Sequence, residues 1–118
     1  MPELQDTINE FERNRIQLMN VSAQKQQLQF QSNTLQASLD ELKKTKEKKV
    51  YKAVGNILIL SDTKNVQKEL REQKDSADLR VKTLQKQEDA LIEKLNKLKS
   101  QIEKSQKPAG EKQEKEEK

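Results

Sequence analysis

The chain has 118 residues, of which 24 are lysine or arginine and 20 are aspartate or glutamate, so its formal net charge is +4. Only 31% of the residues are hydrophobic and 3% are aromatic, which leaves little material for a globular core and favours a few long elements. Histidine and cysteine are both absent. Their absence excludes Cys/His zinc sites, iron–sulfur clusters, disulfides, thiol nucleophiles and histidine acid–base chemistry, so we expect neither an enzyme nor a cofactor or metal.

The chain shows no signal for a membrane or a secretory route. No apolar run approaches the roughly 18 residues that span a bilayer, and residues 1–6 have no basic stretch leading into an apolar one. The charges of both signs are interspersed, so the net positive charge is weak evidence for a nucleic-acid partner. We expect a cytoplasmic protein that binds neither membrane nor nucleic acid.

A long first helix is predicted over residues 1–48. Neither proline nor glycine interrupts residues 3–54, and apolar residues recur three and four positions apart, as on the buried seam of a coiled coil. Arg15, Lys25 and Ser32 complete this spacing, and a second interval of three between Leu18 and Val21 predicts local overwinding. The apolar seam residues are Leu4, Ile8, Phe11, Leu18, Val21, Leu28, Leu35, Leu39 and Leu42.

A β-hairpin is predicted over residues 49–61. Two runs rich in β-branched residues flank Gly55-Asn56, a two-residue signal for a type II′ turn in which Gly55 takes the positive φ. An isolated two-stranded ribbon is marginally stable, and residues 57–60 are apolar on both faces of the strand. We therefore expect the strands to pair with copies of themselves or with a sister subunit. The expected oligomerisation residues are Val50, Tyr51, Val54, Gly55, Asn56, Ile57, Leu58, Ile59 and Leu60.

A second helix is predicted over residues 62–105, with Ser61, Asp62 and Thr63 as candidate N-cap residues. Its seam keeps an unbroken spacing of four and three at positions 70, 74, 77, 81, 84, 88, 91, 95, 98 and 102. Two seams of matched length can cover each other in an antiparallel hairpin, so the predicted fold is mainly α, a long two-helix coiled coil with a central β-hairpin. Residues 106–118 are predicted to be a disordered, charged tail.

Antiparallel pairing predicts a candidate binding surface where the start of the first helix meets the end of the second. With Leu42 near Leu70, Phe11 lies near residue 101 and Leu18 near residue 94. Seam residues near a fraying end can open to hold an apolar segment, or can be ordinary seam residues. Off-seam apolar residues at the same level either mark an interaction site or are normal surface residues. These candidate tip residues are Leu4, Ile8, Phe11, Ile16, Met19, Ile92, Leu98 and Ile102.

Two charged features have structural explanations as well as functional ones. A lysine cluster beside the hairpin could bind phosphate, or could complement the helix dipole and discourage wrong strand pairing; its members are Lys43, Lys44, Lys46, Lys48, Lys49 and Lys52. Glu88 on the seam either pairs with a lysine such as Lys25 or fixes the register of the helices. Asp40, Glu41 and Asp89 are expected on solvated faces.

The hairpin segment Val50-Tyr51-Lys52-Ala53-Val54-Gly55-Asn56-Ile57-Leu58-Ile59, between two long coiled-coil helices, resembles the β-type subunits of archaeal prefoldin, a chaperone family also called GimC. The resemblance spans residues 1–105. It implies a heterohexamer of two α and four β subunits whose hairpins form β-barrels and whose coiled coils hold unfolded polypeptides. It also implies delivery to a group II chaperonin without ATP hydrolysis. A structural coiled-coil adaptor, a basic nucleic-acid-binding hairpin and self-assembly without an α partner remain as alternatives.

Overall fold

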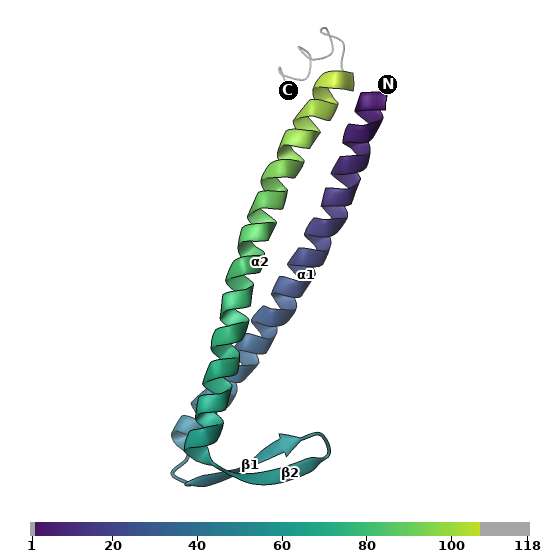
Figure 1. Ribbon diagram of the computed structural model, residues 1–118. Coiled ribbons are helices and arrows are strands. Elements are labelled where there is room, and N and C mark those ends of the chain that lie inside the picture. Colours follow the sequence, from purple (N-terminus) through teal and green to yellow (C-terminus); the bar gives the residue numbers. More distant parts are fainter. Residues whose placement is uncertain (1, 107–118) are drawn as a thin grey trace. The chain divides into compact units, whose positions relative to one another are not determined.

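The computed structural model describes residues 2–106 and places four elements in chain order (Figure 1). Helix α1 spans Pro2–Lys44, strand β1 Lys49–Val54, strand β2 Ile57–Asp62 and helix α2 Thr63–Gln106. The predicted fold class, two long helices with a central hairpin, is confirmed. The predicted tail, apart from residue 106, lies outside the described residues. Over residues 2–106, no helix is long and apolar enough to cross a membrane.

The chain forms two compact units. Among the described residues, unit 1 contains 2–23 and 85–106, and unit 2 contains 24–84 with the hairpin. In each unit a part of α1 lies beside a part of α2, and the two run in opposite directions (Figure 1). Each unit therefore has its own section of antiparallel helix pair and its own buried seam.

The seam of α2 matches the sequence pattern throughout. All ten predicted positions from 70 to 102 are buried or half-buried, and the seam continues toward the start of the helix through Val66 and Thr63. Every third or fourth residue lies on the same face of a helix, so this regular spacing gives one continuous stripe. Ala77, Leu84, Leu95 and Leu98 are the most deeply buried apolar residues of the ten.

The seam of α1 differs from the prediction at one position. Arg15 is exposed, and Asn14 is buried instead. The Asn14 side-chain amide donates a hydrogen bond to the carbonyl of Glu10 (2.8 Å), which satisfies one of its polar groups. A guanidinium would carry a full charge into the seam, so Arg15 turns outward and bonds Glu12. The repeated interval of three consequently falls at positions 8, 11 and 14 rather than at Leu18 to Val21.

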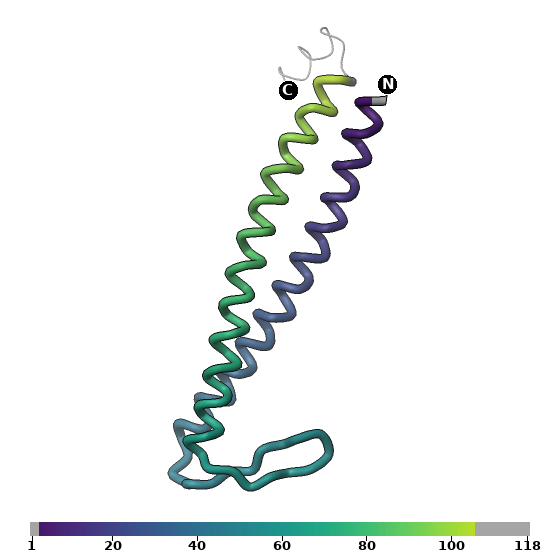
Figure 2. The backbone as a smooth tube through the Cα atoms, viewed as in Figure 1, coloured from purple at the N-terminus to yellow at the C-terminus, as the bar shows by residue number. Residues whose placement is uncertain are grey.

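The hairpin has the predicted tight turn (Figure 2). Strands β1 and β2 pair antiparallel, from Lys49 with Asp62 to Val54 with Ile57, which leaves Gly55 and Asn56 as the turn. Gly55 has a φ of 60°, and no non-glycine residue in the described range has a positive φ. A type I′ turn needs positive φ at both central residues, so this combination agrees with the type II′ turn.

The ends of the hairpin are tied together where the helices meet it. Helix α1 ends at Lys44 rather than at residue 48, and the Glu47 N–H donates to the Thr45 hydroxyl (3.2 Å). The buried Thr63 donates its N–H to the Lys48 carbonyl and its hydroxyl to the Glu47 carbonyl, both at 2.8 Å. These bonds join the segment that leaves α1 to the first residue of α2, and they fix the base of the hairpin.

Candidate protein-binding surfaces

The hairpin exposes a large amount of apolar surface. The side chains that face solvent, here called the hairpin surface, are Tyr51, Val54, Ile57, Leu58, Ile59 and Leu60. Tyr51 and Leu58 are the most exposed, at 69% and 68%. Paired residues share a face, so Tyr51 and Leu60 lie on one face and Val54 and Ile57 on the other. The strand was predicted to be apolar on both faces, and the structure confirms that both faces carry exposed apolar side chains.

The two edges of this sheet are not equivalent. The sheet has only two strands, so β1 and β2 each have one unpaired edge. Strand β1 contains Lys49 and Lys52, and charged residues on an edge strand discourage pairing with another strand. In β2, residues 57–60 contain no charge. The β2 edge is therefore the one open to strand addition.

One ion pair connects the hairpin to the helices of unit 2. The Lys52 ammonium lies 2.5 Å from the Glu69 carboxylate on α2, and both side chains are partly exposed. Val50 and Ser61, which pair with each other across the strands, are half-buried. They lie on the same face as Lys52, so this is the face of the hairpin that turns toward the helices.

All eight predicted tip residues lie in unit 1, but they differ in exposure. Leu98 is buried, and four others are half-buried on the seam: Leu4, Ile8, Phe11 and Ile102. Ile16, Met19 and Ile92 lie off the seam and are exposed. The seam residues are available to another chain only when the helices separate, whereas the three off-seam residues are available without any rearrangement.

Two polar contacts join the helices in unit 1. The Ser22 hydroxyl on α1 donates to the Glu88 carboxylate on α2 (2.5 Å), and Glu10 forms an ion pair with Lys94 (3.1 Å). With Ser22 beside Glu88, Leu18 lies level with residue 92 rather than with the predicted residue 94. The apolar pattern alone determines the register only to within part of a helical turn, which accounts for the difference. Ile92 thus lies at the level of Leu18 and Met19.

Sequence comparisons and a structural comparison agree on the family. A family model described as "Prefoldin subunit" matches residues 5–109. The chain is 39% identical over 104 residues to "Prefoldin subunit beta" of Pyrobaculum islandicum, and the matched region covers 87% of this chain and 83% of that protein. It is 38% identical over 94 residues to the protein of the same description from Archaeoglobus fulgidus, covering 79% and 81%. This chain belongs to the prefoldin family.

A solved prefoldin structure has the same fold. The crystal structure of the prefoldin beta subunit from Thermococcus strain KS-1 matches with a TM-score of 0.83 at 30% sequence identity. The match covers 92% of this chain and 96% of that one. Prefoldin subunits are chaperones, so the resemblance in the hairpin segment correctly indicated the family, the fold and a role in protein folding.

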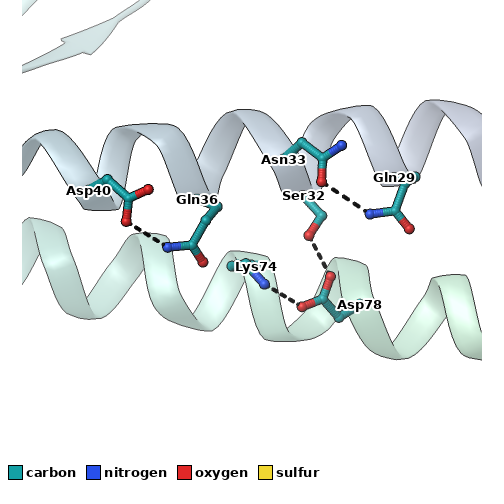
Figure 3. A network of polar contacts seen from close by, with 7 residues as sticks. All are labelled: Gln29, Ser32, Asn33, Gln36, Asp40, Lys74 and Asp78. Carbon is teal, nitrogen blue, oxygen red and sulfur yellow. Dashed lines mark hydrogen bonds and ion pairs between the residues drawn. The ribbon is translucent and has the colours of Figure 1, made fainter.

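A polar network joins α1 to α2 in unit 2 of this prefoldin chain (Figure 3). It was not predicted as a network from the sequence. The Ser32 hydroxyl on α1 donates to the Asp78 carboxylate on α2, and the Lys74 ammonium lies 2.7 Å from the other oxygen of Asp78. Two hydrogen bonds hold the pKa of Asp78 below its ordinary value, and the one from Lys74 has a larger effect than the one from Ser32. The sequence signal was present in part, because Ser32 already occupied a predicted seam position.

The lysine cluster lies where the helices meet the hairpin. Lys43 and Lys44 end α1, Lys49 and Lys52 lie on β1, and Lys46 and Lys48 lie in the connection between them. Lys44 pairs with Glu41 and Lys52 with Glu69. These positions agree with the two structural roles expected for the cluster, at a helix C-terminus and on an edge strand. The phosphate-binding alternative stays a prediction.

Proposed function

We propose that this chain is a β-type subunit of a hexameric prefoldin with two α and four β subunits, which captures unfolded polypeptides without ATP and passes them to a group II chaperonin. The observation that supports this most strongly is the hairpin surface, six large apolar side chains exposed on a sheet of only two strands. A two-stranded ribbon with such a surface gains stability by pairing with further strands. Family membership supports α and β subunits as the source of those strands.

Client capture is assigned to unit 1 in this proposal. Ile16, Met19 and Ile92 provide exposed apolar side chains at neighbouring levels, and Met19 has a flexible thioether that adapts to varied partners. Each such site is small, so a single subunit binds an unfolded chain weakly. Several copies on one body make rebinding intramolecular and raise the avidity. Folded proteins rarely expose large apolar patches, so the complex discriminates in favour of unfolded ones.

Leu4, Ile8, Phe11, Leu98 and Ile102 extend this surface in the proposal. They lie on the seam toward the ends of both helices, and helix ends fray more readily than helix interiors. An apolar segment of a client could take the place of the partner helix there. These five residues therefore join the binding surface only when the helix ends separate. The three off-seam residues make the first contact.

The test uses the complex assembled with a prefoldin α subunit and a chemically denatured protein that aggregates on dilution. In the variant Ile16→Ser/Met19→Ser/Ile92→Ser we expect an unchanged hexamer mass and a loss of most aggregation suppression. The matched control is Phe30→Ser/Leu79→Ser, which removes two exposed apolar side chains from unit 2. Full suppression by the triple variant, or equal losses in both variants, would contradict the assignment to unit 1.

A further inference from the structure

Two serine hydroxyls of α1 lie on or beside its buried seam, where an apolar seam does not need them. Ser32 is only 2% exposed, and Ser22 is half-buried. A buried hydroxyl without a hydrogen-bond partner is unfavourable, so an alignment that gives each serine an acceptor is favoured. Both have one on the opposite helix, Glu88 for Ser22 and Asp78 for Ser32. We call these two serine–carboxylate pairs the rungs.

The two rungs follow the same antiparallel register. Ser32 lies ten residues after Ser22 on α1, and Asp78 lies ten residues before Glu88 on α2. Two helices that run in opposite directions with equal rise keep such pairs level. The rungs lie in different units, so each unit has its own contact that specifies the alignment of α1 with α2.

The apolar seams alone tolerate a different alignment. Coiled-coil seams repeat every seven residues, so sliding α2 by one repeat again places apolar residues opposite apolar residues. The same shift would bring Ser22 level with Val81 or Leu95, neither of which accepts a hydrogen bond. It would also separate the Asp78 and Glu88 carboxylates from their serine donors. The shifted alignment thus carries a penalty that the native one lacks.

Both rung carboxylates have a second donor on α2, and for Glu88 it is the Gln85 side-chain amide (3.3 Å). Asp78 accepts from Ser32 through one oxygen and from Lys74, one turn earlier on α2, through the other (Figure 3). Lys74 itself occupies a half-buried seam position. Lys74 and Asp78 are on the same helix, so a slide of α2 leaves their ion pair intact. Only the Ser32–Asp78 hydrogen bond depends on the alignment of α1 with α2.

We propose that the Ser22–Glu88 and Ser32–Asp78 rungs are specificity determinants that, together with the Thr63 bonds at the base of the hairpin, select the native register of α1 against α2 over the registers shifted by one seven-residue repeat. The inference depends on the fold and not on the proposed chaperone function. Register also decides which residues share a level, since Ile92 lies level with Leu18 and Met19 only in the native alignment. The rungs therefore determine the composition of the client surface that we assign to unit 1.

The absence of cysteine from the chain allows a direct test with engineered disulfides in the full-length protein. Leu39 lies seven residues after Ser32 on α1, and Leu70 lies eight residues before Asp78 on α2, within one residue of the same level, so Leu39→Cys/Leu70→Cys reports the native register. Leu39→Cys/Ala77→Cys reports the register shifted by one repeat. A disulfide requires Cα atoms within about 7 Å, so the two pairs are mutually exclusive in one alignment. Oxidation is done at low concentration, and the monomer band is analysed by peptide mass.

With the rungs intact, we expect the native pair to form its disulfide and the shifted pair to form almost none. Replacing Ser22, Glu88, Ser32 and Asp78 by leucine should raise the shifted disulfide by roughly tenfold or more while leaving the helix content unchanged, because buried polar pairs specify register more than they stabilise. A shifted disulfide that stays at the background level in this variant would overturn the proposal.

The test also includes an alanine variant of the rungs and a control variant. Should the leucine variant misfold, the same four positions are changed to alanine, since removing both partners of a hydrogen bond is tolerated far better than removing one. The control is Gln36→Ala/Asp40→Ala, which removes a 2.9 Å hydrogen bond contained within α1 (Figure 3). The control should leave the shifted disulfide at background; an increase equal to that of the rung variants would also overturn the proposal.

Discussion

The Ser32 hydroxyl and the Asp78 carboxylate form a hydrogen bond between α1 and α2 at a seam level where coiled coils usually place apolar side chains. Ser32 is almost fully buried, whereas Asp78 reaches partly into solvent and is shared with Lys74. The pair thus gives a buried donor its acceptor without burying a full charge. Its pH dependence follows from that arrangement.

Acid should weaken unit 2 through Asp78. The folded-state pKa of Asp78 is lowered, so its contribution is fully present above the unfolded-state pKa near 4 and is lost as the pH falls through the folded-state pKa. Between about pH 6 and pH 3, the Tm of Asp78→Asn should fall less than the Tm of the unmodified chain. Circular dichroism at 222 nm measures both.

The matched control for this titration is Asp75→Asn. Asp75 is exposed one turn away on the same helix. Its substitution should leave the acid-induced fall in Tm close to that of the unmodified chain. If Asp78→Asn loses as much Tm in acid as Asp75→Asn does, the Asp78 contacts make no titrating contribution to stability.

Burial decides the cost of truncating a leucine in this chain. Leu39 is 4% exposed on the α1 seam, and Leu79 is 67% exposed on α2. Leu39→Ala should lower the free energy of unfolding by about 2–5 kcal/mol, because it leaves a cavity in the seam. Leu79→Ala should change it by no more than about 0.5 kcal/mol. Urea denaturation of both variants checks the difference, and equal costs would mean that the seam does not hold the helices together.

Much of this fold could be predicted because its physical signals are periodic. The α2 spacing is unbroken from 70 to 102, and every position it marked is buried or half-buried. The Gly55-Asn56 turn was equally clear, since glycine takes a positive φ without a side-chain clash. The family followed from the hairpin segment between the two helices.

The errors lie where polar residues occupy the seam. Asn14 and Arg15 are both polar, so hydrophobic spacing could not choose between them; the capacity of asparagine to bond the Glu10 carbonyl decides it. The predicted register was about two residues away from the one that Ser22 and Glu88 define. Glu88 was expected to fix the register or to pair with a lysine; its partner Ser22 lies beside the seam position Val21, where apolar spacing carries no signal for it.

The turn glycine should strengthen assembly. Gly55 has a left-handed φ of 60°, and an added Cβ would meet nothing within 4 Å, so Gly55→Ala introduces backbone strain alone. That strain is about 1–2 kcal/mol, and the α-subunit concentration needed for half-assembly should rise roughly 5- to 30-fold. Asn56→Ala is the control, because Asn56 does not have a positive φ. Equal effects of the two substitutions would show that turn strain is not the cause.

Charge on the hairpin surface should block assembly without unfolding the helices. Leu58 and Leu60 are exposed on the same face, so Leu58→Lys/Leu60→Lys should preserve the Tm of the free chain and prevent formation of a complex with the α subunit. Phe30→Lys/Leu79→Lys places the same charges on the helices and should assemble normally. Size-exclusion chromatography with light scattering measures the masses. Normal assembly of the hairpin variant would exclude this surface as the interface.

The most direct test of the proposed function is the mass of the purified chain, alone and mixed with a prefoldin α subunit, together with suppression of aggregation by each sample. We predict a complex of about six subunits that keeps a chemically denatured protein from aggregating in the absence of ATP. A stable dimer that ignores both the α subunit and the denatured protein would contradict the account and would favour a structural coiled-coil adaptor.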